Sequence, residues 1–172
     1  MKRQITPTQV ERVMRENDFI VSKTDLTGRI TYGNKIFIEF SGYDEEELLG
    51  TQHNIIRHPD MPRAVFKLLW DTLKQEQEVC AYVKNMAKDG SHYWVFANVT
   101  PSYDLAGKVI GYYSVRRKPR EDVVKVIAQL YKKMREIERN NDPNRGLELS
   151  TKLLTDLLTE HKTTYEKFIL TL

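Results

Sequence analysis

Cysteine is almost absent from this sequence. The 172 residues contain one, Cys80, so no intramolecular disulfide can form, which favours a reducing compartment. No apolar run approaches the roughly 20 residues needed to span a bilayer, and residues 1–10 lack the apolar core of a secretory signal. These absences predict a soluble, cytoplasmic protein with no direct membrane insertion.

Neither sign of charge is in strong excess. The 27 basic and 24 acidic side chains are interspersed and give a net charge of +3. The one local basic excess is the short run Arg116, Arg117, Lys118 and Arg120. A nucleic-acid-binding domain usually shows a clustered basic stripe, so we expect no nucleic-acid partner. With 40% hydrophobic residues, the composition is that of a globular domain.

Motifs for catalysis are also missing. The sequence has no glycine-rich phosphate loop, no metal-spaced His/Cys cluster and no nucleophile elbow. We therefore expect neither an enzyme nor a metal site.

Secondary-structure signals divide the chain into three parts. Residues 1–17 predict an N-terminal helical cap, in which Thr6 is the N-cap, Pro7 takes the first helical position and Val10, Val13 and Met14 form the apolar face. Residues 18–118 form the central domain. Residues 119–172 predict a C-terminal helical hairpin, with helices at 122–139 and 147–170 separated by breaker residues 140–146.

The central domain begins and ends with strands. Two short strands are predicted around a turn at Gly28, then short helices and one longer helix, then three strands with period-2 alternation. The predicted strands are 19–24, 29–33, 79–85, 92–100 and 109–117, and the helices are 35–40, 45–49 and 63–74. The economical packing is an α+β fold, a five-stranded antiparallel sheet with the helices on one face.

Several strings resemble the PAS domain family. They are Thr24–Tyr32 followed by Asn34, Phe40–Tyr43, and the late hairpin turn Lys88–Gly90. A ten-residue string, His53-Asn54-Ile55-Ile56-Arg57-His58-Pro59-Asp60-Met61-Pro62, is similar to the corresponding segment in PAS domains of bacterial aerotaxis receptors. The resemblance covers roughly residues 18–118.

The resemblance implies non-covalently bound FAD and a sensor of redox state or oxygen. It also implies signalling to a separate, membrane-bound chemoreceptor-like transducer, as in the soluble half of a split energy-taxis receptor of the CetB type. A homodimer is predicted from the apolar face of the N-terminal helix and from outer-face sheet residues such as Tyr113 and Val115. Docking of that helix within one chain explains the same residues.

Nine residues are candidates for the cofactor site: Asn34, His53, Arg57, His58, Asp60, Phe66, Trp70, Asn85 and Trp94. Trp70 is either a wall of the flavin slot or a plain core aromatic. Asn85 either contacts the polar ring edge with its amide or faces water from an edge strand, and His53 is a second polar contact or a solvent-facing loop residue.

Arg57 and His58 are the phosphate candidates, because arginine binds phosphate oxygens in a planar, bidentate way. Asp60 either orients one of them or caps the helix after Pro62. Asn34 is a helix cap first and a ligand contact second. The positions of Phe66 and Trp94 follow from the resemblance alone.

Other ligands remain open. A haem gas sensor would use His53, His58 or His92 as axial ligand, and a ligand-free interaction module needs no cofactor at all. A light-sensing domain of the LOV type attacks its flavin with a helix cysteine. The corresponding stretch here, residues 54–57, has none, and Cys80 reads as a small core residue in a strand.

Overall fold

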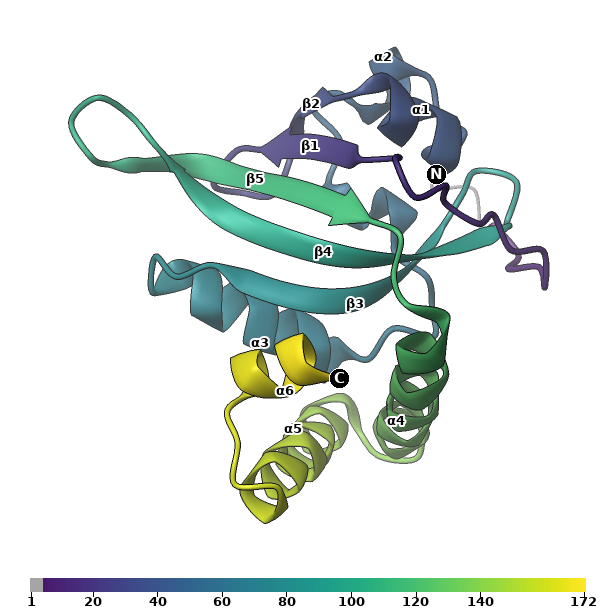
Figure 1. The fold of residues 1–172 in the computed structure, drawn as a ribbon, viewed down its shortest axis with the longest axis vertical. Coiled ribbons are helices and arrows are strands. Elements are labelled where there is room, and N and C mark those ends of the chain that lie inside the picture. The colour runs from purple at the N-terminus through teal and green to yellow at the C-terminus, as the bar shows by residue number, and fades with distance from the viewer. Residues whose placement is uncertain (1–4) are drawn as a thin grey trace.

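The computed structural model describes residues 5–172. Its centre is a five-stranded antiparallel sheet of order β2-β1-β5-β4-β3 (Figure 1). The strands are β1 (Ile20–Thr24), β2 (Ile30–Gly33), β3 (Val79–Met86), β4 (His92–Tyr103) and β5 (Val109–Arg117). The predicted α+β fold is confirmed.

Short helices connect β2 to β3 on one face of the sheet. They are α1 (Lys35–Ser41), α2 (Glu45–Leu48), a 3-10 turn η1 (His53–Ile56) and α3 (Arg63–Lys74). Local sequence sets where α1 begins and ends. The Asn34 side chain accepts a hydrogen bond from the backbone N–H of Phe37, and Gly42 ends the helix at φ 69°, in the left-handed region that favours glycine.

The prediction of an N-terminal helix is wrong. Residues 7–17 contain no helix and instead run beside the start of β4. Thr8 N–H donates to Gly90 O, Arg12 N–H donates to His92 O, and His92 N–H donates to Val10 O. Of the three residues of the proposed apolar face, Val10 and Val13 are 62% and 61% exposed and only Met14 is buried, so the face does not pack as a unit. A short helix without packing is marginal in water, and pairing with an open strand satisfies the same backbone groups.

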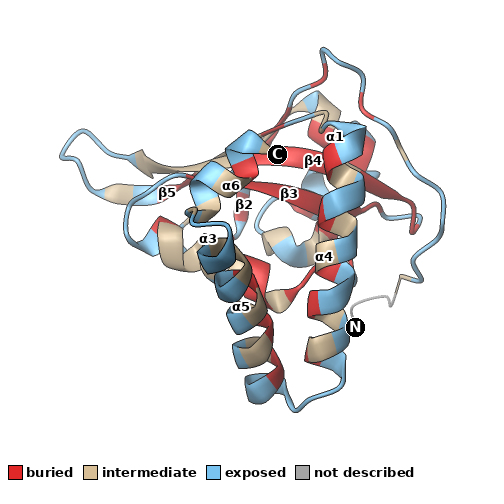
Figure 2. Ribbon diagram, turned by 60° about the horizontal axis from the view of Figure 1, so that its bottom comes forward, coloured by how far each residue is buried: buried red, intermediate tan, exposed pale blue. Residues whose placement is uncertain are grey.

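The C-terminal part contains α4 (Glu121–Arg139), α5 (Pro143–Glu160) and α6 (Tyr165–Thr171). The α4–α5 pair confirms the predicted hairpin (Figure 2). The prediction of one continuous last helix over residues 147–170 is wrong in two respects. It begins earlier, because the Asp142 side chain caps the N–H groups of Asn144 and Arg145 with a proline in the first turn. It also breaks near Lys162 (φ 48°), and the Thr164 side chain caps α6 as a new helix.

This extension wraps around the β3 edge of the sheet. Helix α5 contacts α3, and α6 contacts β3. The Tyr131 hydroxyl of α4 donates to the backbone carbonyl of Tyr82 at 2.8 Å and its ring stacks on Trp94 at 6.2 Å. Buried residues of the extension, including Ile127 and Met134, belong to the same hydrophobic cluster as the sheet. Among residues 5–172, no helix is both long and apolar enough to cross a membrane.

Candidate ligand-binding site

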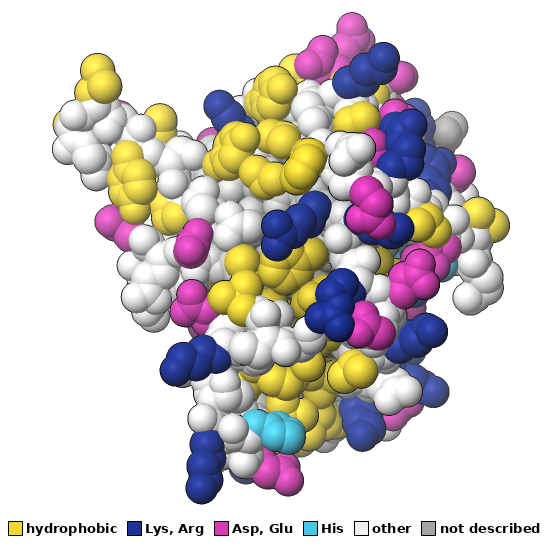
Figure 3. Space-filling view, viewed as in Figure 1, with side chains coloured by type: hydrophobic (Ala, Val, Ile, Leu, Met, Phe, Trp, Pro, Cys, Tyr) yellow, Lys and Arg dark blue, Asp and Glu magenta, His cyan; other side chains and the backbone are white. Residues whose placement is uncertain are grey.

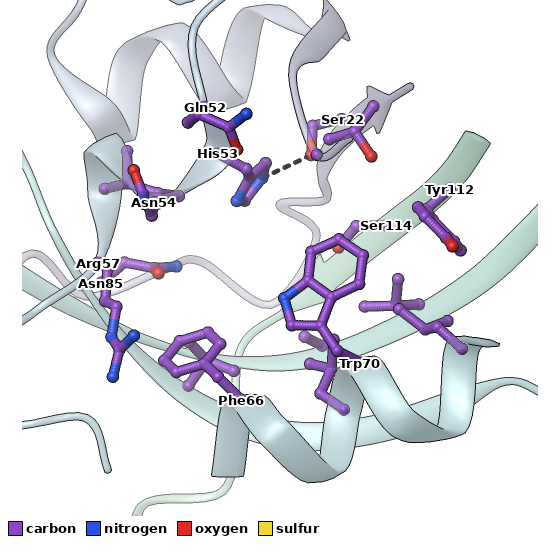
Figure 4. A pocket seen from close by; sticks show the side chains of 18 of the residues that line it. Ser22, Gln52, His53, Asn54, Arg57, Phe66, Trp70, Asn85, Tyr112 and Ser114 are labelled. Atoms are coloured by element: carbon purple, nitrogen blue, oxygen red, sulfur yellow. Dashed lines mark hydrogen bonds between the residues drawn. The ribbon is translucent and has the colours of Figure 1, made fainter. Parts of the chain in front are cut away.

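A cavity of about 300 Å³ lies between the sheet, η1 and α3 (Figure 4). This size is in the range of small-molecule sites. Much of its wall is apolar and comes from both layers: Ile56, Leu69, Leu73, Val83, Ala97 and Val99. The sheet residues reach it because alternate residues of a strand face the same side.

Two aromatic side chains of α3 face this cavity. Phe66 and Trp70 are four residues apart, so they lie on one face of the helix, and both line the space (Figure 4). The Trp70 ring packs edge-on against Tyr112 of β5 at 5.4 Å. Gly28 lies close to the indole, since a Cβ there would sit 3.4 Å from the ring. Trp70 was expected to be either a wall of a flavin slot or a plain core aromatic, and Phe66 was a candidate from the resemblance alone.

Polar groups enter from the sheet and from η1. Asn85 of β3 is 4% exposed, and Figure 4 shows its amide pointing into the cavity. Within residues 5–172 this amide makes no side-chain hydrogen bond. It can therefore donate to a ligand and accept from it.

His53, Ser22 and Arg116 form a hydrogen-bonded chain on the cavity wall. Arg116 Nη2 donates to Ser22 Oγ, and Ser22 Oγ lies 3.1 Å from His53 Nε2. Because Ser22 accepts from the guanidinium, its own proton is free to go to Nε2. Burial, and then the nearby Arg116 charge, lower the pKa of His53 to about 3, so the imidazole is neutral near pH 7.

Arg116 was not among the predicted site residues. In the sequence it is only the first residue of a short basic run, yet in the structure it is 2% exposed and lines the cavity. Its Nε and Nη1 have no hydrogen-bond partner among the described residues, and burial lowers its pKa to about 10. The signal that would have found it is strand alternation, because Tyr112, Ser114 and Arg116 share one face of β5.

Arg57 stands where the cavity meets a shallow groove. Its guanidinium lies 4.2 Å from the centre of the Phe66 ring and donates to the carbonyl of Met61 at 3.2 Å. The adjoining surface, here called the arginine groove, is lined by Asn54, Arg57, Pro59, Met61, Arg63 and Arg135. Arg135 belongs to α4, so the C-terminal extension forms part of this surface.

Four predicted site residues lie outside the cavity lining. Asn34 caps α1 and also donates to Phe19 O. Trp94 faces the opposite side of the sheet, against Tyr131. Asp60 pairs with Lys84 at 2.9 Å and does not cap α3.

His58 is the fourth and is buried beside His92, with ring centres 5.9 Å apart. Its Nδ1 accepts the backbone N–H of Asp60 at 3.1 Å. Burial and the charge of Lys84 lower its pKa to about 4. Among residues 5–172, no group of three or more His, Cys, Asp or Glu side chains is arranged to hold a metal ion.

A five-stranded antiparallel sheet whose short helices enclose a ligand-sized cavity on one face is the arrangement of a PAS domain. The family model described as PAS fold matches residues 30–116. The chain belongs to the PAS family.

Relatives with curated functions agree with this assignment. The chain is 38% identical over 140 residues to the aerotaxis receptor of Escherichia coli K12, a match that covers 81% of this chain and 28% of the receptor. It is 31% identical over 97 residues to a nitrogen fixation regulatory protein of Klebsiella pneumoniae, covering 56% of this chain and 20% of that protein. The chain therefore spans less than a third of the length of these relatives.

Solved structures give the same fold. A light-oxygen-voltage domain studied with a flavin analogue superimposes with a TM-score of 0.57 at 24% identity, covering 64% of this chain and 83% of that domain. The light state of the Aureochrome1 LOV domain gives 0.56 at 24% identity, covering 66% and 90%.

Proposed function

We propose that this protein is a redox or oxygen sensor that binds FAD non-covalently in its PAS cavity. The observation that carries the proposal is the mixed character of the cavity: aromatic and aliphatic walls with a few convergent polar groups. An isoalloxazine ring needs an apolar slot and hydrogen-bonding groups for its polar edge. Phe66 and Trp70 suit the first need, and Asn85 with His53 suits the second.

The arginine groove supports a dinucleotide in preference to FMN. It adjoins the cavity through Asn54 and Arg57, which line both. Its three arginines face one buried carboxylate, Glu138, which lies 2.9 Å from Arg135 and 3.5 Å from Arg63. The remaining positive charge matches a diphosphate, and the Arg135 Nε has no hydrogen-bond partner among residues 5–172. Arginine is well suited to phosphate oxygens.

A bound flavin would supply reversible electron uptake, and the chain would act as a sensor and not as an enzyme. A covalent photoadduct with cysteine has no support, because the single cysteine, Cys80, contacts Asn98 and does not line the cavity.

The proposed signalling partner is inferred from the similarity to the aerotaxis receptor. We propose a cytoplasmic sensor that acts on a membrane-bound chemoreceptor-like transducer and forms a homodimer. Hydrophobic side chains gather over β1 and β5 on the sheet face seen in Figure 3. Phe19, directly before β1, and Tyr32 of the neighbouring strand β2 are 49% and 45% exposed. Exposed apolar patches of this kind often mark interfaces.

An absorption spectrum of the purified protein tests the cofactor. Bands near about 370 and 450 nm indicate flavin, and chromatography of the acid-released cofactor against FAD and FMN standards identifies which one. A Soret band would replace this proposal with a haem sensor. A protein with neither signal, and with no uptake of added FAD or FMN, would be a ligand-free interaction module.

A further inference from the structure

Arg116 is a buried cation with no counter-ion among the residues that the structure describes. Its side chain lines the cavity, its residue is 2% exposed, and two of its three guanidinium nitrogens lack any hydrogen-bond partner among the described residues. The only other group that shifts its pKa, besides burial, is the Tyr93 hydroxyl. The guanidinium lies 4.9 Å from the centre of the Phe37 ring, a contact that offsets part of the cost of burial. A buried charge of this kind costs free energy unless a group of opposite charge or a hydrogen-bonding ligand pairs with it.

The position of Arg116 is fixed by the centre of the sheet. Strand β5 lies between β1 and β4, and Arg116 pairs with Ile20 on one side and with Ala97 on the other. Its hydrogen bond to Ser22 ties the guanidinium to β1 as well. The side chain cannot reach solvent without breaking this packing, so the charge stays at the cavity.

Among residues 5–172, the other basic side chains that line the cavity are either neutral or occupied by other contacts. His53 is neutral near pH 7, since its pKa is lowered to about 3. Lys67 is paired with Asp71, and the Arg57 guanidinium stacks on Phe66 where the arginine groove begins. With apolar walls around it, the field of Arg116 is weakly screened inside the cavity.

We propose that Arg116 sets the reduction potential of the bound flavin by stabilising the reduced ring. This inference rests on the proposed flavin binding. When the ring takes up two electrons from a reduced electron carrier and one proton from solvent, it gains one net negative charge. A buried, unpaired guanidinium interacts with that charge more strongly than with the neutral oxidised ring, so it favours reduction. The redox state at which the sensor switches is therefore set by this residue.

Potentiometric titration of two variants with dithionite as reductant tests the proposal. Arg116→Gln removes the charge, and we expect the ratio of reduced to oxidised flavin at the wild-type midpoint to fall at least tenfold, a shift of about 30 mV for a two-electron couple. Arg116→Lys keeps the charge, and the ratio should stay within about threefold of wild type. A Gln variant that binds flavin with the wild-type midpoint, or a Lys variant shifted as far as Gln, overturns the inference.

A second measurement needs only the wild-type protein. The change of midpoint with pH counts the protons taken up with two electrons, and we expect one near pH 7 and a value closer to two in Arg116→Gln. Uptake of two protons by the wild type would mean a neutral reduced ring and would overturn the inference while leaving flavin binding intact. A wild-type protein that takes up no flavin would overturn the proposed function and this inference together.

Discussion

Glu138 of α4 caps the helix that carries the cavity aromatics. Its Oε1 accepts the backbone N–H of Ala64 at 3.1 Å, and its Oε2 accepts that of Arg63 at 3.0 Å, at the first turn of α3. The carboxylate is fully buried and also receives a hydrogen bond from Arg135. The C-terminal extension thus satisfies the free N–H groups of the helix that bears Phe66 and Trp70, and it contributes a negative charge where the helix dipole favours one.

Removal of this cap should destabilise the whole protein. We expect Glu138→Ala to lower the free energy of unfolding by about 3 kcal/mol, because two backbone donors and Arg135 lose a charged acceptor in a buried place. Urea unfolding followed by circular dichroism measures this. Glu136→Ala, at an exposed position of the same helix, is the control and should change stability by less than about 0.5 kcal/mol. Equal effects of the two variants would contradict the capping role.

The docking of the N-terminal segment depends on Gly90. A Cβ at Gly90 would lie 2.2 Å from the carbonyl oxygen of Thr6, whereas a Cβ at Gly107 would meet nothing within 4 Å. Both glycines have a similar positive φ, 87° and 78°, so alanine costs about 1–2 kcal/mol of backbone strain at each. We expect Gly90→Ala to destabilise by about 1–3 kcal/mol more than Gly107→Ala. We also expect faster proteolysis near residues 5–12 in Gly90→Ala but not in Gly107→Ala.

Stability should fall in mild acid because of His58. Its side chain is 3% exposed. Burial and the charges of Lys84 and His92 lower its pKa to about 4, although Asp60 opposes them. The unfolded chain takes up this proton first, so the contribution is fully present above about pH 6.5 and is lost as the pH falls towards 4. The expected slope is about 1.4 kcal/mol per pH unit for this group.

His58→Asn separates this group from His53, whose lowered pKa acts in the same direction. Asn keeps an acceptor for the Asp60 N–H but does not titrate. Between pH 6 and 5, the slope of unfolding free energy against pH should drop by about one proton relative to wild type. His161→Asn, at an exposed position, should leave the slope unchanged. An unchanged slope in His58→Asn would show that His58 is already charged in the folded protein.

The arginine groove predicts a preference for FAD that Arg135 controls. We expect Arg135→Gln to reduce the ratio of FAD to FMN affinity about tenfold, or about 1.4 kcal/mol, as measured by fluorescence titration of the apoprotein. Lys132→Gln, an exposed change on the same helix, should leave the ratio unaltered. Because Arg135 also donates to Glu138, unfolding must be measured in parallel. A loss of both flavins in equal proportion would assign Arg135 a structural role only.

We expect Asn85, which lines the cavity from β3, to relay a change in the redox state of the flavin to the sheet. An amide can exchange donor for acceptor by rotation without a change of charge, and Asn85 faces Tyr93 across the β3–β4 pair. We expect Asn85→Ser to retain flavin with severalfold weaker affinity and to reduce the difference in β3 amide hydrogen exchange between oxidised and reduced protein. Asn98→Ser, on the opposite face of β4 and bonded to Cys80, is the matched control. If the hydrogen-exchange difference in Asn85→Ser is as large as in wild type, Asn85 is not the relay, and His53 becomes the next candidate.

Local patterns predicted much of the cavity. Period-2 alternation located the three long strands, and α3 brought Phe66 and Trp70 to one face because they are four residues apart. His53, Arg57 and Asn85 also line the cavity, and these were predicted from the ten-residue string and the strand pattern. Phe66, by contrast, came from the resemblance alone.

Other site groups were decided by partners far along the chain. In the sequence Arg116 is one of a short run of basic residues, and only the β1–β5–β4 pairing shows that it is buried beside Ser22, 94 residues away. The N-terminal helix failed for the same reason, since Val10 and Arg12 bond to His92 and form no helical turn.

The sequence by itself determined the order of the five strands and of helices α1 to α4, the turns at glycine and the family, because these depend on residues within a few positions of one another. The tertiary structure decided which charges are buried and what they meet. Glu138 at the N–H groups of Arg63 and Ala64, and Arg116 at the cavity, are contacts between segments about 75 and 94 residues apart. Burial removes water from a charge, and whether that charge is then paired depends on how distant segments pack, which no local pattern encodes.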